Sequence, residues 1–541
     1  MTDAKDILAR FKIADMLKQG ITTIWRDVAA QTDPLQRDIG LDYATSGTPS
    51  ISGGAMIFDS SGRDAARTYA AGCVSWMTPS ETPWFGFKAP RYLRADDRAE
   101  SYYSECTDIA REILAGTNFY SEVHMLFNDD GIFGTSGMTI KEDDSYGICF
   151  SALPVGRYSI LENHRREVDT LFQVHRFSPR QAAMEFGEEN LPEEIRKALL
   201  DPRKCDAESH EFINYIAPRT KRDRFKTNIQ NAPFASIWID RKSSKVVKES
   251  GYLESPFVVH RHALFGNCPY GRSPGMEAIF DMRHLNYMQQ QLDTLVEKYV
   301  TPPVIVPANF EGVIDLRARG ITFVPDMSQI PRHWDQSGGN YNIGADRTEF
   351  RKRQIDRAFH VELFQALNSV PVGKEMTAAE IRMRQQDRLP TFSPTFNRKA
   401  REVLDPVNRL VFAMLLRMGA FPPAPDQIVQ RTAEGEAFIP DPQIVYSSRM
   451  ALQLQSIHND ALLDTMNTAG MMAQFDPSVL DNFNFDEAAR SYARNVGLQE
   501  ANIRPEQDRD AIRQSRADAQ AAAEQEASML EEGETVAKLA R

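Results

Sequence analysis

A long amphipathic segment between residues 274 and 299 constrains the fold of this chain more than any other feature. Apolar side chains recur there at steps of three and four residues, which places them along one side of a helix. These positions are Ala278, Met282, Leu285, Met288, Leu292, Leu295 and Tyr299. Ser273 is a suitable N-cap, and Pro274 suits the first helical position. Pro302 and Pro303 prevent continuation. The segment therefore predicts a helix of roughly 36 Å.

A second helix is expected after a short β-rich segment. Residues 304–325 are rich in β-branched and turn-forming residues, and a glycine-containing loop follows at residues 337–344. Residues 346–367 then carry an apolar row at helical spacing. The row consists of Ile355, Phe359, Leu363 and Leu367. This order predicts a long helix, a small β-containing tip and a second long helix. A capping box at Thr377–Glu380 indicates the start of another helix.

The remaining sequence predicts a helix-rich α+β fold. Residues 4–30 and 99–127 each have helical periodicity, whereas residues 146–177 and 206–265 are typical of short strands separated by turns. A later apolar pattern contains Pro406, which must kink or restart its helix.

The end of that pattern and the region beyond it are also predicted to be helical. Asp405 is a possible N-cap beside Pro406, and Gly419 is suited to the end of the same helix. Residues 448–497 predict two or three further helices.

Composition indicates a large globular chain in a reducing environment. A length of 541 residues suggests about three or four domains or subregions. The content of 42% hydrophobic and 26% charged residues is ordinary for a soluble globular protein. No run of about 18 apolar residues is present, so no transmembrane helix is expected. The five cysteines are scattered and have no metal-ligand spacing, so neither a disulfide framework nor a zinc site is expected.

The net charge limits how the chain can interact with nucleic acid. A formal charge of −12 argues against a protein that grips nucleic acid tightly over its surface. It does not exclude a conduit, because a channel must let phosphates slide.

Known catalytic motifs do not indicate an active site in the sequence. There is no GxxxxGK[ST] or HExxH pattern. The one GxSxG match, residues 271–275, contains the Ser273 and Pro274 assigned above to a helix start, so we expect no cofactor, no metal and no enzymatic activity. His260 and His262 flank Arg261 on a probable strand and would share one face, but no further metal ligand is evident nearby. They are therefore interpreted as structural histidines. Carboxylates are abundant, so a hydrolase or nuclease with a scattered acidic site is kept as an alternative.

Several passages resemble the portal, or head-to-tail connector, proteins of short-tailed double-stranded DNA phages. The strongest similarity lies in YGRSPGMEAIFDMRHLN at residues 270–286 and EMTAAEIRMR at residues 375–384. The FDS start at residue 58, the run GTNFYSEVHMLF and the run GIFGTSGM are also similar to that family. The clip region departs from it, because Arg317-Ala-Arg319-Gly320 stands where a proline-glycine-glycine turn is expected.

The resemblance implies a portal-type subunit with a mixed α/β wing, a two-helix stem, a small β-containing clip and a helical crown. The expected parts are a wing at residues 1–270, a first stem helix at 271–300, a clip at 301–345, a second stem helix at 346–367, a tunnel loop at 368–376, a kinked helix with remaining wing at 377–446, and a crown with a C-terminal tail at 447–541.

Three sets of candidate functional residues follow, two of them implied by the resemblance and one, a basic run, taken from the sequence itself. The tunnel loop that faces the DNA channel corresponds to Val370, Pro371, Val372, Gly373 and Lys374. A basic run on the second stem helix is a possible contact for DNA or for a neighbouring subunit; its members are Arg347, Arg351, Lys352, Arg353 and Arg357. The alternative for that run is a solvated helix face with local ion pairs. Terminase and tail docking correspond to the clip residues Arg317, Arg319 and Phe323.

The expected function is that of a non-enzymatic ring of about twelve copies at one capsid vertex. Such a ring passes double-stranded DNA during packaging and ejection. Its expected partners are further copies of the chain, the DNA, the terminase large subunit, a tail adaptor, and capsid or scaffold proteins, with no membrane. Its expected location is the virion, and the host cytoplasm during assembly. Another phage structural protein, such as a tail or scaffold component, is the second alternative.

Overall fold

The structure is a computed structural model in which the chain forms two compact units, residues 1–448 and residues 449–541. It describes residues 4–34, 57–93, 97–143, 147–220, 222, 228–300, 304–306, 308, 332–333, 341–368, 392–431, 437–496, 504 and 508–521. None of the helices within these residues is both long and apolar enough to span a bilayer.

The first unit combines helices with small antiparallel sheets, as expected for a helix-rich α+β fold. Its helices are α1 (Ala4–Thr32), α2 (Ser61–Met77), α3 (Asp97–Gly116), α4 (Phe119–Phe133), α5 (Pro179–Phe186), α6 (Glu193–Leu199), α7 (Pro274–Val300), α8 (Tyr341–Ala358), α9 (Val361–Asn368) and α11 (Asp405–Arg417). Residues 392–399 are also helical.

Two sheets account for most of the strands in the first unit. The larger has the order β4-β5-β6-β7-β8, and its strands are β4 (Tyr158–Glu162), β5 (Val168–Phe177), β6 (His210–Pro218), β7 (Phe234–Asp240) and β8 (Val246–Tyr252). The smaller has the order β3-β2-β9, with β2 (Thr135–Asp143), β3 (Gly147–Ala152) and β9 (Phe257–Arg261).

Three further pairs of short strands complete the described sheets. They are β1 (Phe85–Lys88) with β14 (Gln443–Tyr446), β10 (Val304–Ile305) with β11 (Arg332–His333), and β12 (Gln430–Arg431) with β13 (Ala437–Phe438).

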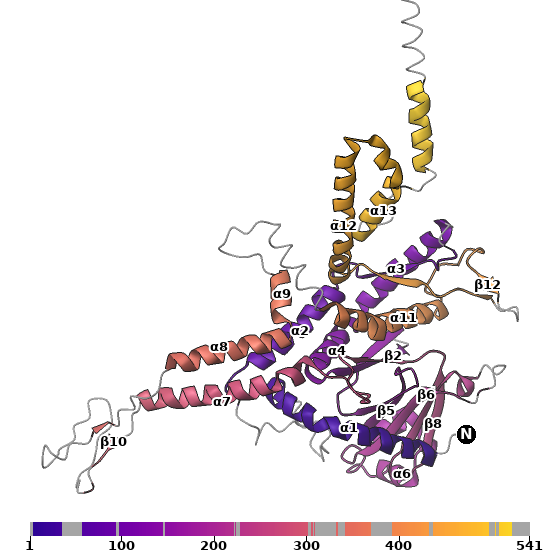
Figure 1. Ribbon diagram of the computed structural model, residues 1–541. Coiled ribbons are helices and arrows are strands. Elements are labelled where there is room, and N and C mark those ends of the chain that lie inside the picture. The colour runs from indigo at the N-terminus through magenta and orange to yellow at the C-terminus, as the bar shows by residue number, and fades with distance from the viewer. Residues whose placement is uncertain are drawn as a thin grey trace, which may run out of the picture. The chain divides into compact units, whose positions relative to one another are not determined.

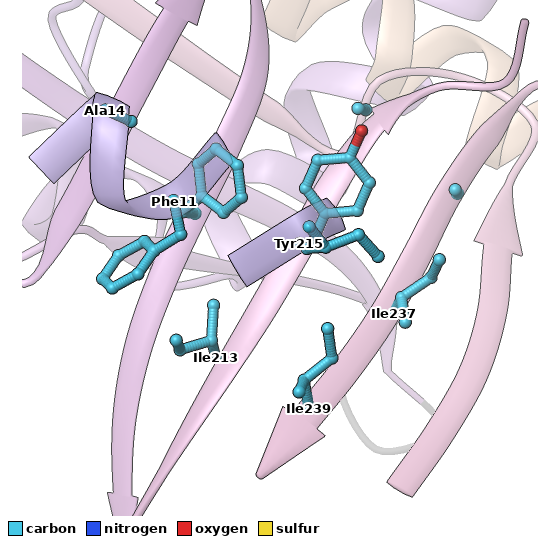
Figure 2. Packing of buried hydrophobic residues seen from close by; sticks show 10 residues of the cluster. Phe11, Ala14, Ile213, Tyr215, Ile237 and Ile239 are labelled. Atoms are coloured by element: carbon cyan, nitrogen blue, oxygen red, sulfur yellow. The ribbon is translucent and has the colours of Figure 1, made fainter. Parts of the chain in front are cut away.

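The first half of α1 covers one face of the five-stranded sheet (Figure 2). Phe11 and Ala14 of the helix meet Ile213, Tyr215 and Ile237 of the central strands, and all are buried. The ring centroids of Phe11 and Phe172 are 5.6 Å apart. Alternate residues of a strand point to the same face, so the spacing of Ile213 and Tyr215 creates this apolar surface.

Helices α5 and α6 pack on the other face of the same sheet. Phe186 of α5 and Ile195 of α6 share a core with Phe212 and Trp238, the strand residues that alternate with those beneath α1. Ser178 caps α5 by accepting a hydrogen bond from the Gln181 backbone N–H, with Pro179 at the first helical turn. Both faces of the sheet are therefore covered by helices.

The helix expected over residues 99–127 is interrupted, which corrects that prediction. α3 ends at Gly116 and α4 begins at Phe119. Between them, the Asn118 side chain donates to the Phe150 carbonyl at 2.7 Å and accepts from the Phe150 N–H at 3.0 Å. This pairing fixes Asn118 against β3 instead of leaving it inside a continuous helix. α4 then continues to Phe133, where Gly134 adopts a positive φ of 71° before β2.

Helices α7 and α8 lie side by side and run in opposite directions (Figure 1). α7 confirms the predicted long helix, and its Ala278, Met282 and Leu285 are buried near its start. α8 begins at Tyr341, so the loop expected to extend to Gly344 ends earlier than predicted. The Leu292 side chain lies so close to Gly344 that a Cβ built there would be 2.6 Å from it.

The second stem helix is not continuous, contrary to expectation. A turn at Phe359–His360 separates α8 from α9, and His360 has a positive φ of 54°. Phe359 and Phe364 are both fully buried, with ring centroids 6.4 and 6.1 Å from that of Tyr69. Residues five apart on a straight helix lie about 140° apart around its axis, so one helix could not direct both rings at Tyr69. The turn changes the direction of the chain so that both rings pack against Tyr69.

A π-helical turn spans Ala400–Leu404, directly before α11. The Asp405 N–H bonds to the Ala400 carbonyl, a spacing of five residues. Pro406 lacks an N–H and its ring would clash with the carbonyl four residues earlier in a regular α-helix, so the wider turn accommodates it. The expectation that Asp405 caps a new helix is wrong, because its carboxylate accepts the hydroxyl of Tyr446 instead. Gly419 follows the helix with a φ of 69°, as predicted for its end.

The second unit is helical within the described residues, as predicted for residues 448–497. α12 (Arg449–Ala473) contacts α13 (Phe485–Val496) and the short 3₁₀ segment Pro477–Asn482 between them. Residues 508–521 are mostly helical, and Arg513 of this segment donates two hydrogen bonds of 2.6 Å to the Asp486 carboxylate.

Candidate functional site

The start of α7 is fixed by a local cap that is itself anchored in the core. The Ser273 hydroxyl accepts a hydrogen bond of 2.9 Å from the Met276 N–H and donates one of 2.7 Å to the Ile132 carbonyl of α4. Pro274 occupies the first helical position. The predicted N-cap is therefore confirmed, and it ties the root of α7 to α4.

Two members of the predicted basic run pair with carboxylates on other elements of the same chain. Arg351 donates to Asp281 of α7, and Lys352 Nζ lies 3.2 Å from the Asp59 Oδ2 that precedes α2. Burial would raise the pKa of Asp59, but hydrogen bonds from Ser61 and the Lys352 ammonium hold it below its usual value. Two of the five basic groups thus fasten α8 to the rest of the unit.

The other members of the basic run face solvent. Arg353 is exposed, and its Nε lies 3.5 Å from Glu349 Oε1 one turn earlier. Arg347 and Arg357 are also exposed, and neither forms an ion pair within the described residues. A role in binding DNA or a neighbouring subunit stays a prediction for these three residues.

The predicted tunnel loop and clip residues lie outside the described residues. This applies to Val370, Pro371, Val372, Gly373 and Lys374, and to Arg317, Arg319 and Phe323. The described part of the expected clip contains the antiparallel pair β10–β11, in which Val304 lies opposite His333.

The two described ends that flank residues 369–391 meet at an aromatic cluster. Phe392 lies 5.6 Å from Phe364 of α9 and 5.4 Å from His360, measured between ring centroids. Phe364 also rests on α2, where a Cβ built on Gly72 would be only 2.3 Å from its ring. Glycine is therefore required at residue 72 by close packing.

Beneath these rings lies a buried group of charged and polar side chains centred on Asp130 of α4. The Asp130 carboxylate accepts hydrogen bonds from the Lys399 ammonium and, at 2.7 Å, from the Tyr69 hydroxyl. His262 Nδ1 lies 3.3 Å from Asp130 Oδ2, and His260 Nε2 lies 3.2 Å from Asp130 Oδ1. Lys399 and Asp130 are fully buried, so their opposite charges compensate each other away from water, and His260 is buried beside them.

A second carboxylate, Glu402 of the π-helical turn, extends this charge cluster. Glu402 Oε2 lies 3.2 Å from His260 Nδ1 and accepts the Arg261 N–H at 2.9 Å. The Arg261 guanidinium donates to Glu402 Oε1 at 3.2 Å and to Glu162 of β4. The cluster thereby joins α4, β4, β9 and the helix that carries Lys399.

Asp130, His260 and His262 have side-chain atoms close enough together to hold a metal ion. The expectation from the sequence that no third metal ligand lies near the two histidines is therefore wrong. However, the Lys399 ammonium already bonds to the Asp130 carboxylate and supplies a positive charge there. The arrangement is therefore an internal ion-pair network, in which each histidine has a carboxylate partner.

The pKa values in and beside this cluster are shifted by burial and by neighbouring charges, which oppose each other only at Asp130. Burial would raise the pKa of Asp130, but Lys399 and the two histidines hold it well below its usual range. Burial raises the pKa of the neighbouring Asp129 to about 8, with Asp33 adding to the shift. Burial lowers the pKa of His360 to about 4, together with the charges of His262 and Lys399.

Sequence reasoning missed the partners of the two histidines because they are distant in the chain. Asp130 precedes His260 by 130 residues, and Glu402 follows it by 142 residues. One signal was available: two adjacent aspartates stand in the otherwise apolar end of α4, between Phe127 and Ile132. Acidic residues in such a setting are rarely buried unless they are paired.

Comparison with known proteins gives consistent matches over most of the chain. The family model described as bacteriophage head to tail connecting protein matches residues 4–503. The probable portal protein of Bordetella phage BPP-1 is 27% identical over 492 residues, covering 89% of this chain and 86% of that protein. The portal protein of Salmonella phage epsilon15 is 27% identical over 470 residues, covering 85% and 82%.

Among solved structures, the neck of an empty GTA particle matches with a TM-score of 0.36 and 13% identity. The match covers 78% of this chain and 89% of that one, and it is too weak to establish the fold.

Proposed function

The chain belongs to the family of bacteriophage head to tail connecting proteins, and we propose that its copies form the portal ring at one vertex of a phage capsid. The observation that carries this proposal is the family match across residues 4–503, supported by the two phage portal proteins that align with most of the chain. The paired helices α7 and α8 and the β10–β11 pair follow the order expected of a stem and clip.

The ring acts as a conduit for double-stranded DNA during packaging and ejection. About twelve copies surround the channel, which is a closed cyclic assembly with one kind of contact between neighbours. The net charge of −12 per chain suits passage rather than retention, because strong cationic contacts with phosphate would hold the duplex in place.

The channel surface is formed in part by the loop at residues 368–376. Val370, Pro371, Val372 and Gly373 are uncharged, so they can touch the duplex without binding it, and Lys374 is the one basic group among these five. The exposed Arg347 is an additional candidate for a phosphate contact.

The clip at residues 301–345 docks the terminase motor during packaging and the tail adaptor afterwards. The sequence has no Walker-type phosphate loop, so the ATPase that moves DNA is a separate protein. The chain itself is non-enzymatic. It assembles in the host cytoplasm with capsid or scaffold proteins and stays in the virion at the portal vertex.

Labelling of assembled virions tests this proposal. An affinity tag on the chain, detected by gold-conjugated antibody after mild opening of the capsids, is expected at one vertex per particle, where the tail attaches. Label at all vertices or along the tail would contradict a portal role. A second tagged structural protein, the major capsid protein, serves as the control for access of the antibody.

A further inference from the structure

α7 carries a second row of side chains that the described part of the chain leaves uncovered. Phe280, His284, Tyr287 and Gln291 recur at steps of four and three residues, so they share one face of the helix. All four are exposed, and Phe280 and Tyr287 are 76% and 59% accessible. The buried row of Ala278, Met282 and Leu285 lies on the other side of the same helix. A helix with large apolar groups on both sides usually has a partner on each.

α8 has an exposed face that combines one aromatic ring with two guanidinium groups, whereas the exposed face of α7 carries no cationic arginine or lysine among the four residues named. Phe350, Arg353 and Arg357 recur at steps of three and four residues and are all exposed, with Phe350 49% accessible. α8 meets α7 through other residues, Arg351 and Gly344, so this outer face is also left outside the helix pair.

The two outer faces lie at the same levels along the helix pair. The two helices run in opposite directions (Figure 1) and Arg351 bonds to Asp281, so Phe350 is level with the stretch of α7 just after Asp281, between Phe280 and Tyr287. Leu292 lies against Gly344. Tyr287, between Asp281 and Leu292, is therefore level with the stretch of α8 that contains Arg347.

The chemistry of one face complements that of the other. Aromatic rings attract guanidinium groups over their faces, an interaction of about 0.5–1 kcal/mol at exposed sites and more once water is excluded. Aromatic pairs also attract each other. A heterologous ring contact requires two different complementary surfaces on each copy, and the α7 and α8 faces satisfy that requirement.

We propose that the outer face of α7 in one copy packs against the outer face of α8 in the next copy, with Phe280 and Tyr287 meeting Phe350, Arg353 and Arg357. This inference rests on the ring assembly proposed above. It assigns Arg353 and Arg357 to contacts between subunits rather than to contacts with DNA.

Cysteine pairing tests the contact directly. The variant with both Phe280→Cys and Phe350→Cys is expected to give a ladder of disulfide-linked multimers under oxidising conditions. Each single variant is expected to give none, because a head-to-tail contact pairs the two different positions. The unaltered chain, with its five native cysteines, is the background control. Dimers from a single variant would contradict the head-to-tail arrangement.

Truncation supplies a second test that does not depend on cysteine geometry. Phe280→Ala with Tyr287→Ala is expected to raise the protein concentration needed for half-maximal ring formation at least tenfold. Met184→Ala, on α5, is the matched control, because that side chain is 81% exposed and lies elsewhere. The control is expected to assemble as the unaltered chain does.

The contact between subunits and the portal function can be disproved separately. Rings that form normally in the double alanine variant, without crosslinks in the double cysteine variant, would overturn this contact while leaving the portal function intact. Absence of rings from the unaltered chain under all conditions would overturn the proposed function itself.

Discussion

Lys399 donates a hydrogen bond to the carboxylate of Asp130, although the two residues are 269 positions apart in the sequence. Both side chains are fully buried. The pair connects the helix at residues 392–399 to α4, and Tyr69, His260 and His262 also contact the carboxylate.

Replacement of Lys399 by Met should destabilise the chain strongly, because Asp130 would remain buried with its main compensating charge removed. Loss of one partner from a buried pair costs about 3–5 kcal/mol. Thermal unfolding of Lys399→Met should therefore occur well below that of the unaltered chain. Lys197→Met is the control, because its exposed ion pair with Glu193 contributes little. Equal unfolding temperatures for Lys399→Met and the unaltered chain would show that the pair is not formed.

Asp129 should make the chain less stable as the pH rises. Its pKa is about 8 in the folded chain, whereas an unfolded aspartate releases its proton near pH 4. Between these values the folded state binds one more proton than the unfolded state, so raising the pH favours unfolding. The Asp129→Asn variant has no carboxyl group to titrate at this position, so its free energy of unfolding should not fall in this way. It should exceed that of the unaltered chain by a few kcal/mol at pH 8 and by much less at pH 5.

Denaturation of both proteins from pH 5 to pH 8 measures that difference. Asp130 must be left intact, because its pKa is lowered whereas that of Asp129 is raised. The stability that Asp130 contributes is lost only as the pH falls below about 4. A stability difference that stays constant with pH would contradict the assignment of the bound proton to Asp129.

Gly72→Ala should destabilise the junction between α2 and α9. The added Cβ would lie 2.3–2.7 Å from ring atoms of Phe364, which is itself held by Tyr69 and Phe392. Overpacking of this kind costs about 1–3 kcal/mol. Gly20→Ala on α1 is the matched control, because its Cβ would meet nothing within 4 Å. That control should be neutral or stabilising by up to about 1 kcal/mol, since alanine favours helix over glycine. Thermal unfolding of the two variants measures the difference, and an unfolding temperature of Gly72→Ala equal to that of Gly20→Ala would contradict the close packing of Phe364 on residue 72.

Sequence alone could place the elements whose signals are local. Ser273 and Pro274 mark the start of α7, and both act in the structure as their positions in the sequence indicated. The apolar row through Met282 and Leu285 is buried as expected. These features depend on residues within one or two helical turns, so they can be inferred without tertiary contacts.

Features that depend on tertiary contacts could not be predicted. The turn between α8 and α9 exists because Phe359 and Phe364 both pack against Tyr69, some 290 residues earlier in the chain. The role of Asp405 was mistaken because its partner, Tyr446, lies on a strand that pairs with β1. The charge cluster around Asp130 was missed for the same reason.

Deletion of Val370–Lys374 should leave ring formation intact and impair DNA passage or retention. The expectation follows from the proposed role of this loop as a channel surface, since the flanking helices are anchored separately through Phe364 and Lys399. Ring formation is checked by electron microscopy, and packaged DNA by nuclease protection in assembled particles. Failure of the deletion variant to form rings would assign the loop to assembly instead.

Electron microscopy of the purified, unaltered chain tests the central claim most directly. The portal assignment predicts closed rings of about twelve copies with a central bore wide enough for duplex DNA. A monomer, a filament or a solid particle without a bore, observed across protein concentrations and salt conditions, would contradict it.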